Sequence, residues 1–567
     1  MLPAPPYRIG MATSTHTVTN QPPPLVAYDV FTADRALAEA VERHLDPAVR
    51  AVARRELAEL GRAAGSAQAQ RWAVQADANP PVLRTHDRYG NRIDEVDFHP
   101  AWHRLLGRAV SSGLANAWGR PGGHVRRAAG FLVWSQAEAG HGCPVSMTHA
   151  AVPALRVDPD LAAEWEPRLT SEVYAQGLRP AARKPGVLFG MGMTEKQGGS
   201  DVRATATRAV PLSAAGEYEL TGHKWFCSAP MSDAFLVLAQ APGGLTCFLL
   251  PRVLDDGTRN VFAIQRLKEK LGNRSNASAE VEFAGTWARR VGEEGRGVAT
   301  IIEMVAATRL DCVLGSAALM RQAVAQAVHH ASYRQAFGGP LADKPLMRNV
   351  LADLAVESEA ATVLAMRLAA AYDAAGRGSE SERALLRLAV PAAKYWVTKR
   401  CTPVVAEALE CLGGNGYVEE SGMPRLLRES PLNSVWEGSG NIQALDVLRA
   451  LRGAPGAAGR GGREPVPLDA FLREVGLARG ADHRLDGAIR GMLAELAELE
   501  SAEVRARRLA ERMALVLQGS LLVRWAPPEV ADAFCASRLG GDWGSAFGTL
   551  PYGLDQAAMV DRARVEV

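Results

Sequence analysis

One glycine-rich segment of the chain carries hydroxyl and acidic side chains between its glycines. It reads Gly190-Met-Gly-Met-Thr-Glu-Lys-Gln-Gly-Gly-Ser-Asp201, and its hydroxyl groups belong to Thr194 and Ser200. Glycines let a backbone approach a flat or phosphorylated ligand closely, and their N–H groups can donate to it. The spacing matches neither a Walker A loop nor a Rossmann fingerprint. The segment therefore predicts either a ligand-binding loop or an ordinary turn between strands.

Two further segments combine aromatic residues with groups that could do chemistry. Gly222-His-Lys-Trp-Phe-Cys-Ser228 places two rings in a strand-like run, where they either fill a core or pack on a planar ligand. Ser434-Val-Trp-Glu-Gly-Ser-Gly-Asn441 sets Glu437 between a ring and a glycine turn. Apolar surroundings raise the pKa of a carboxyl group toward the range of a general base. Taken alone, a glutamate beside glycine is more typical of a solvated loop.

The apolar pattern divides the chain into blocks that must position these segments. Helical periodicity dominates on both sides of a central region of short strand-like runs, which lie at residues 186–189, 218–228, 234–238, 245–250 and 281–283. The predicted blocks are an arm (1–30), a helical domain (31–185), a β domain (186–290), a helical bundle (291–452), a linker (453–464) and a C-terminal helical domain (465–567). One predicted helix face consists of Val350, Leu354, Ala361, Leu364 and Leu368.

Composition excludes several classes of protein. Apolar residues make up 47% and charged residues 22% of the 567 residues, which is typical of a globular protein. The formal net charge of +2 argues against binding nucleic acid or membranes through bulk charge alone. The seven cysteines are scattered without metal-binding spacing, so we expect reduced thiols, no metal and a cytoplasmic location. Neither a secretory signal nor a transmembrane span is predicted.

The three segments occur together with other motifs in an order that resembles the acyl-CoA dehydrogenase superfamily. The additional motifs are Lys270-Leu-Gly-Asn-Arg-Ser275, Arg334-x-x-Phe337-Gly338 and Leu412-Gly-Gly-x-Gly-Tyr417. Each motif is weak alone, but together they cover nearly the whole chain to about residue 452. The resemblance implies a mainly α fold with a central β domain. It consists of an N-terminal helical domain, a middle β-barrel and a C-terminal helical bundle, to which this chain adds a C-terminal helical domain.

The same resemblance implies FAD as the cofactor and α,β-dehydrogenation of an acyl thioester as the reaction. In the family a carboxylate removes the α-proton while the β-hydride passes to the flavin, and Glu437 matches one position used for that base. The residues expected to bind FAD within the chain are Met191, Gly192, Met193, Thr194, Gly199, Ser200, Trp225, Phe226, Cys227, Val435, Trp436, Gly438, Ser439, Gly440, Asn441 and Leu445. The residues expected to be lent by a neighbouring subunit of a homotetramer are Arg334, Phe337, Gly413 and Gly414.

Two positions depart from the pattern of the family. Cys227 stands where many members have a hydroxyl residue that contacts the flavin, which leaves the reactivity of the flavin open. Asp311 places a second carboxylate two residues after Arg309, on the helix that shapes the acyl pocket. Asp311 either discourages an apolar acyl chain or is a solvated or paired residue.

Further motifs resemble a DNA-associated branch of the superfamily that responds to alkylation damage. They are Thr15-His-Thr-Val-Thr-Asn-Gln-Pro22, Phe98-His-Pro-Ala-Trp-His103, Glu195-Lys-Gln197, Gly272-Asn-Arg-Ser-Asn-Ala-Ser278 and Thr308-Arg-Leu-Asp311. This resemblance implies binding of double-stranded DNA, a part in protection or repair, and weak isovaleryl-CoA dehydrogenase activity. Arg505, Arg508 and Arg512 fall on one predicted helix face and are candidate phosphate contacts. A solvated helix face with ion pairs inside the same helix explains them at least as well.

Two alternative functions remain open from the sequence. The first is a working dehydrogenase of short branched acyl-CoA that passes electrons to an electron-transfer flavoprotein. The second is a flavin-bearing structural tetramer whose C-terminal block only mediates assembly.

Overall fold

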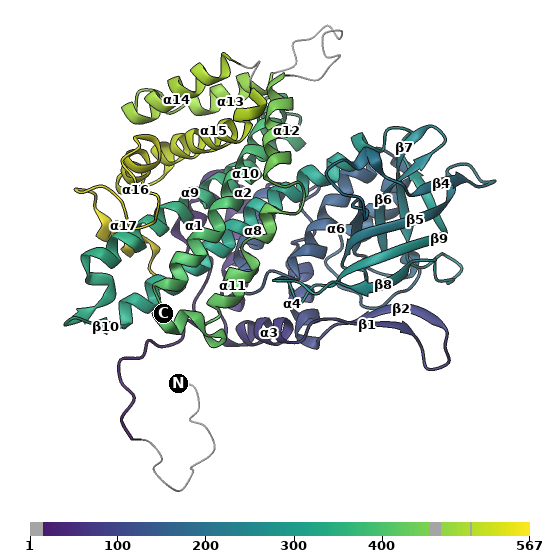
Figure 1. The fold of residues 1–567 in the computed structure, drawn as a ribbon, viewed down its shortest axis with the longest axis horizontal. Coiled ribbons are helices and arrows are strands. Elements are labelled where there is room, and N and C mark those ends of the chain that lie inside the picture. The colour runs from purple at the N-terminus through teal and green to yellow at the C-terminus, as the bar shows by residue number, and fades with distance from the viewer. Residues whose placement is uncertain (1–14, 453–465, 499–501, 567) are drawn as a thin grey trace.

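Helices fill most of the molecule, and a β-barrel stands at one end of it (Figure 1). The computed structural model describes residues 15–452, 466–498 and 502–566. The first 14 residues of the predicted arm and the predicted linker over residues 453–464 lie outside the described residues. Within the described part, no helix combines the length and the apolar character that crossing a bilayer requires. All seven cysteines are buried and unpaired.

The N-terminal part consists of short helices, most of which begin at a polar side chain that caps them. The helices are α1 (Arg35–His44), α2 (Pro47–Ala64), α3 (Ala67–Ala78), α4 (Pro100–Ser111), α5 (Gly123–Ser135), α6 (Gly142–Leu155) and α7 (Pro159–Leu169). Asp34, for example, accepts the amide of Leu37 at 3.1 Å and so satisfies a free donor of α1. The sequence did not predict the hairpin of β1 (Val82–His86) and β2 (Arg92–Asp97) that interrupts this part.

The central strands close into a barrel. They are β3 (Phe189–Gly192), β4 (Arg208–Pro211), β5 (Glu217–Ser228), β6 (Ala234–Ala241), β7 (Gly244–Pro251), β8 (Ala263–Leu267) and β9 (Ser278–Val291). Pairing runs β6–β7–β9–β5–β4 and returns to β6. Strand β6 is buried on both faces because Phe235 and Val237 fill the barrel while Leu236 and Leu238 face the helices.

Three long helices form the core of the C-terminal bundle. They are α8 (Gly297–Tyr333), α9 (Pro345–Gly376) and α10 (Glu380–Glu410). Of the predicted face of α9, Leu354, Ala361, Leu364 and Leu368 are buried. Between and after these helices lie β10 (Gln335–Ala336), β11 (Gly339–Pro340), the turns η3 (Leu341–Asp343), η4 (Gly413–Tyr417), η5 (Glu419–Ser421) and η6 (Leu432–Ser434), and the helices α11 (Met423–Glu429) and α12 (Gly440–Arg452).

A second helical block packs against this bundle. It contains α13 (Pro467–Gly476), α14 (His483–Leu496), α15 (Ala502–Trp525), α16 (Pro528–Phe534), a π-helical turn (Cys535–Leu539) and α17 (Gln556–Ala563). Arg562 of α17 pairs with Glu39 at 2.7 Å and with Glu359 at 2.9 Å, which joins the end of the chain to α1 and α9. The predicted mainly α architecture with a central β-barrel and an added C-terminal helical block is confirmed.

Candidate active site

Glu437 lies in a tight turn between η6 and α12, beside the middle of α8. Its φ of 57° is in the left-handed region, which is unfavourable for a residue other than glycine. The hydroxyl of Thr308 on α8 lies 2.7 Å from Glu437 Oε2, within hydrogen-bonding distance of the carboxylate. A strained turn that aims a carboxylate at a fixed partner is typical of a functional site.

Three side chains from other elements hold the backbone of this turn. Lys394 Nζ, from α10, donates to the carbonyl oxygens of Trp436 at 2.6 Å and Gly438 at 2.5 Å. Arg309 Nε donates to the carbonyl oxygen of Glu437 at 3.2 Å, and Gln443 donates to the same oxygen at 3.0 Å. The turn is thus held on both sides of Glu437, and its strain is offset by charge-assisted hydrogen bonds.

The surroundings of Glu437 favour its neutral form. Burial raises the pKa of its carboxyl group, while the hydrogen bond to Thr308 and the charges of Lys394 and Arg309 lower it by less. Arg309 is itself neutralised by Asp446, at 2.6 Å. A carboxyl group with a raised pKa can take up a proton near neutral pH, which is what a general base must do.

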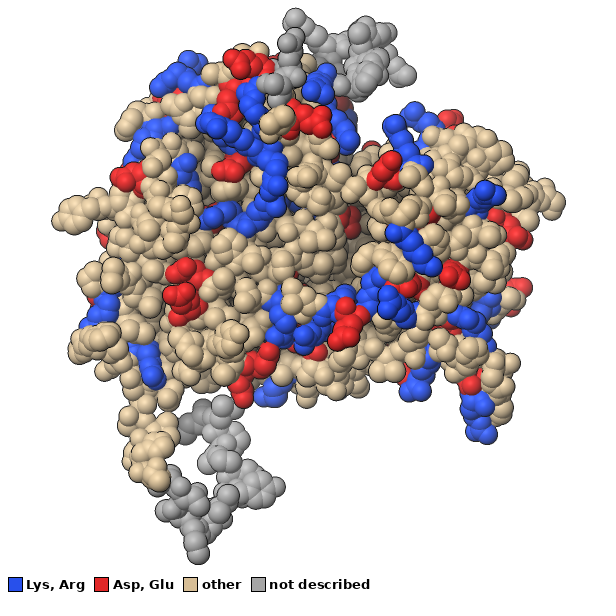
Figure 2. All heavy atoms as spheres, viewed as in Figure 1, with Lys and Arg blue, Asp and Glu red and all other residues tan. Residues whose placement is uncertain are grey.

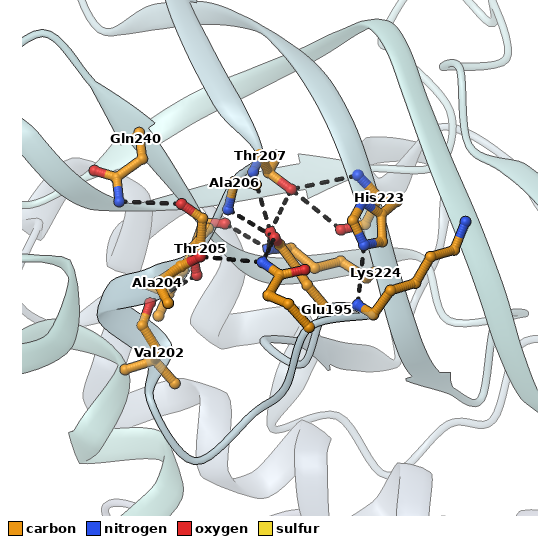
Figure 3. Close-up of polar contacts among 12 residues, drawn as sticks. Glu195, Val202, Ala204, Thr205, Ala206, Thr207, His223, Lys224 and Gln240 are labelled. Atoms are coloured by element: carbon orange, nitrogen blue, oxygen red, sulfur yellow. Dashed lines mark hydrogen bonds and ion pairs between the residues drawn. The ribbon is translucent and has the colours of Figure 1, made fainter.

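The two glycine and aromatic segments of the barrel lie side by side. The amide of Trp225 donates to the carbonyl of Thr194 at 2.8 Å, which joins the loop after β3 to β5. Glu195 anchors this loop: it accepts from Lys224 Nζ at 2.6 Å and from the hydroxyl of Thr207 at 2.5 Å (Figure 3). Burial raises the pKa of Glu195, but these hydrogen bonds outweigh it and the pKa falls to about 2.

Basic side chains surround the aromatic rings of Trp225 and Phe226 on β5. Lys268 Nζ lies 3.6 Å from the centroid of the Trp225 ring and 4.5 Å from that of Phe226. Lys196 Nζ and Arg266 Cζ each lie 5.9 Å from the Trp225 centroid. These cations are themselves paired with carboxylates, Lys268 and Arg266 with Glu280 at 2.8 and 2.7 Å and Lys196 with Glu282 at 3.7 Å. The rings therefore offer a planar ligand an aromatic surface rather than an excess of positive charge.

The side chain of Cys227 faces away from this surface. It is fully buried in the barrel core, and burial raises the pKa of its thiol to about 12. Only the backbone of Cys227 is therefore left for the predicted flavin contact.

The residues predicted to come from a neighbouring subunit lie far from Trp225 in the same chain. Arg334 and Phe337 follow the end of α8, whose 37 residues span about 55 Å. Helix α8 begins at the barrel, and Figure 1 shows β10 and β5 at opposite sides of the molecule. The Gly413–Gly414 turn lies at the end of α10. Helix α10 runs parallel to α8, because Lys394 reaches the Glu437 turn that Thr308 also contacts, while Cys401, further along α10, donates to the carbonyl of Ser316, further along α8. One chain alone cannot bring these two groups together.

The residues at this far end suit an anionic, aromatic ligand. Phe337 is 92% exposed and has a left-handed φ of 52°. Arg334 has no carboxylate partner within the described part of the chain. A Cβ added at Gly413 or Gly414 would meet no atom within 4 Å. Together with the rings of Trp225 and Phe226, these residues fit the flavin, the diphosphate and the adenine of FAD.

The contacts of Asp311 and of the arginine stripe on α15 decide between the alternatives that the sequence left open for them. Asp311 forms a bidentate pair with Arg127, at 2.6 and 2.7 Å, and both side chains are buried. The interpretation of Asp311 as a paired residue is therefore correct. The arginine stripe of α15 is also paired: Arg508 and Arg512 both contact Glu495 of α14, at 2.9 and 2.7 Å.

Arg505 belongs to the same paired stripe. It donates to the carbonyl oxygens of Glu495, at 3.4 Å, and of Glu498. Figure 2 shows basic and acidic side chains interleaved over the C-terminal helices. The predicted alternative was a helix face with ion pairs inside one helix. The structure instead pairs Arg508 and Arg512 of α15 with Glu495 of the neighbouring helix α14.

Sequence reasoning assigned no role to Lys394, Gln443, Lys268 or Arg127. A lysine inside the apolar stretch of α10 was a detectable signal for Lys394, because a buried lysine needs a partner. The contact of Lys268 with Trp225 depends on the pairing of β8 with β9 and had no local signal.

Comparison with known proteins agrees with this geometry. Three family models match: the adaptive response protein AidB N-terminal domain over residues 20–176, the acyl-CoA dehydrogenase middle domain over 190–286 and the acyl-CoA dehydrogenase C-terminal domain over 295–452. AidB of Escherichia coli (strain K12) is 45% identical over 534 residues, which cover 93% of this chain and 94% of that protein. Acyl-CoA dehydrogenase family member 11 of Caenorhabditis elegans is 32% identical over 67% of this chain and 64% of its own.

Solved structures extend the likeness to the whole fold. The structure of Caenorhabditis elegans ACDH-11 in complex with C11-CoA superimposes with a TM-score of 0.81 at 27% identity, covering 93% of this chain and 94% of that one. The β-barrel and the long helices are thus parts of one known architecture. The chain belongs to the acyl-CoA dehydrogenase family of FAD-dependent oxidoreductases, and within that family it is a homologue of AidB.

Proposed function

We propose that Glu437 is the base that removes the α-proton of an acyl-CoA thioester. The observation that carries this proposal is the held turn: a carboxyl group with a raised pKa, placed by Thr308 and clamped by Lys394. The C11-CoA bound to the nematode relative supports an acyl-CoA as the substrate class. Isovaleryl-CoA is the first substrate to test, and we expect slow turnover.

FAD fits between the barrel of one chain and the far end of α8 of another. The chemistry that FAD supplies when bound is the acceptance of the hydride from the β-carbon. The loop of Met191–Ser200 and the rings of Trp225 and Phe226 hold the flavin, and Val435–Leu445 close the site. Arg334 of a neighbouring copy donates to the diphosphate. This arrangement requires a homo-oligomer, which we propose to be a tetramer.

Replacing Glu437 by glutamine tests the catalytic proposal. The variant keeps the size of the side chain but cannot accept the α-proton, so we expect FAD to remain bound and its bleaching by isovaleryl-CoA to disappear. Stopped-flow absorbance of the purified yellow protein measures both properties. Glu420→Gln, at an exposed position, is the matched control. Bleaching of the Glu437→Gln variant at the wild-type rate would remove Glu437 from the role of base.

We also propose that the protein binds double-stranded DNA as part of protection or repair against alkylation damage. The similarity to AidB supports this role. On the described surface, Arg449, Arg452 and Arg507 are exposed on α12 and α15, which pack together, and they have no carboxylate partner there. Phosphates compete better for such unpaired arginines than for the stripe neutralised by Glu495.

Two triple variants separate these candidate DNA contacts. Binding to duplexes of unrelated sequence is followed by fluorescence anisotropy across a salt series. Replacing Arg449, Arg452 and Arg507 by alanine should reduce the slope of log affinity against log salt by about two to three. The same change at Arg505, Arg508 and Arg512 should reduce it by less. Absence of DNA binding by the wild-type protein at low salt would reject the DNA role. The acyl-CoA dehydrogenase activity would then be the only proposed function left.

A further inference from the structure

The N-terminal arm lies against the hairpin that carries Arg334. Asn20 is the centre of this contact: its side-chain amide donates to the carbonyl of Gln335, and its side-chain oxygen accepts the amide of Gln335, both at 2.8 Å. Arg334 Nη1 donates to the carbonyl oxygen of Asn20 at 2.6 Å. Close by, His329 Nε2 lies 2.8 Å from the carbonyl oxygen of Pro23. The arm thus binds a segment more than 300 residues away in the sequence.

The hairpin needs this support because it is very short. Strands β10 and β11 pair over only two residues each, and a pair of that length is not stable by itself. The amide and carbonyl of Gln335 point to the outer edge of β10, where Asn20 satisfies both groups in the manner of a third strand. Asn20 reaches this position with a φ of 57°, a region in which asparagine is tolerated better than most residues.

The arm also orients the guanidinium group of Arg334. A guanidinium has five N–H donors, and the bond to Asn20 uses one of them. Because the described part of the chain offers Arg334 no carboxylate, its other donors are available to an anion from outside the chain. Phe337 lies exposed at the tip of the same hairpin, so its position also depends on the hairpin keeping its shape.

We propose that Asn20 is a positioning residue of the dinucleotide site, which makes the N-terminal arm a functional part of that site. Asn20 fixes the β10–β11 hairpin and one N–H of Arg334, so that the remaining guanidinium donors meet a diphosphate bound to a neighbouring copy. The inference rests on the proposed function, in which Arg334 binds the diphosphate of FAD. It goes beyond that proposal by assigning a ligand-related role to the arm.

The test measures release of FAD from the purified full-length protein. The yellow protein is diluted, and the recovery of free-flavin fluorescence gives the dissociation constant, while sedimentation velocity at the same concentrations gives the oligomeric state. The variants are Asn20→Ala, Arg334→Ala and the double variant. Thr17→Ala, at an exposed position of the same arm, is the matched control.

We expect the dissociation constant for FAD to rise about tenfold in Asn20→Ala and further in Arg334→Ala. If Asn20 acts through Arg334, the double variant should bind FAD no more weakly than Arg334→Ala, and the oligomeric state should not change. Thr17→Ala should match the wild type. This non-additive pattern distinguishes positioning from a general loss of stability.

Four results would overturn the inference, and those that spare the proposed function can be distinguished from the one that rejects it. Unchanged FAD affinity in Asn20→Ala removes Asn20 from the site but leaves the proposed function intact. Additive losses in the double variant, or dissociation of the oligomer in step with loss of FAD, show that Asn20 only attaches the arm. A wild-type protein that retains no FAD rejects the proposed function itself, and the inference with it.

Discussion

At the scale of single residues, the Glu437 turn depends on one buried ammonium group. Lys394 is 1% exposed and donates to the carbonyls on both sides of Glu437. Lys394→Met keeps the length of the side chain but leaves the Trp436 carbonyl without its donor and the Gly438 carbonyl with Gln443 alone, at a cost of about 1 to 3 kcal/mol. We expect bleaching by acyl-CoA to slow at least tenfold while FAD remains bound.

A second buried lysine provides the control for this prediction. Lys184 is 5% exposed and donates to Asp233 at 2.6 Å, away from Glu437. Lys184→Met should lower the melting temperature to a similar degree without slowing the bleaching. Equal rates in the two variants would show that Lys394 acts on stability alone.

Glu429 gives the stability of the protein a pH dependence of definite sign. Its carboxyl group is 6% exposed, and burial, together with the charge of Glu138, raises its pKa to about 7. Between pH of about 4.5 and about 7 the folded state keeps a proton that the unfolded state has released, so the free energy of unfolding falls as the pH rises.

Glu429→Gln should remove this pH-dependent decrease in the free energy of unfolding. At pH 8 the variant should be more stable than the wild type by about 3 kcal/mol, and at pH 4.5 the two should be close. Thermal unfolding at both pH values checks the prediction, with the exposed Glu420→Gln as control. If the stability of wild type and of Glu429→Gln changed equally between the two pH values, the prediction would be wrong.

At the scale of elements, a buried ion pair joins α5 to α8. Arg127 and Asp311 are each less than 10% exposed, and their contact is bidentate. Asp311→Asn leaves the charge of Arg127 buried without a counter-charge, so we expect a loss of about 3 to 5 kcal/mol in the free energy of unfolding.

Replacing both partners should recover most of this loss, because Arg127→Met with Asp311→Leu buries no charge. Denaturant unfolding of the three proteins measures the coupling. If Asp311→Asn lowers the free energy of unfolding by less than the double replacement does, Asp311 does not neutralise Arg127. We expect the substrate preference to be the same in these variants as in the wild type, because Asp311 points toward Arg127 of α5.

At the scale of the whole molecule, the proposed FAD site is divided between two copies of the chain. Strand β5, which carries Trp225, and β10, which follows Arg334, lie at opposite sides of the molecule, so the proposal requires Trp225 of one chain and Arg334 of another for each FAD. A mixture of Trp225→Ala and Arg334→Ala subunits therefore regenerates some intact sites, although each variant alone has none.

Co-expression of the two variants with different affinity tags tests this division. Random mixing should restore about one quarter of the wild-type flavin content, because both required residues must meet in the same site. Flavin absorbance per subunit in the doubly tagged fraction is the measurement. Flavin content no higher than that of either variant alone would show that one chain holds the whole site.

The sequence by itself determined the local features of this protein. Glycine spacing, the aromatic pair and the Glu437 turn are chemical properties of adjacent residues, and they are enough to predict which segments form the candidate site. Strand-like runs predicted most of the barrel, but β4, β8 and the β1–β2 hairpin were missed. These three elements are short or exposed, so their sequences lack the apolar runs that identify a buried strand.

Only the tertiary structure decided which distant groups meet. Lys394 reaches the Glu437 turn because α8 and α10 run parallel in one register, and Arg127 reaches Asp311 because α5 crosses α8. The length of α8 separates Arg334 from Trp225, and the arm returns to the hairpin across more than 300 residues. Such partners are selected by packing between elements, and no spacing within a segment encodes them.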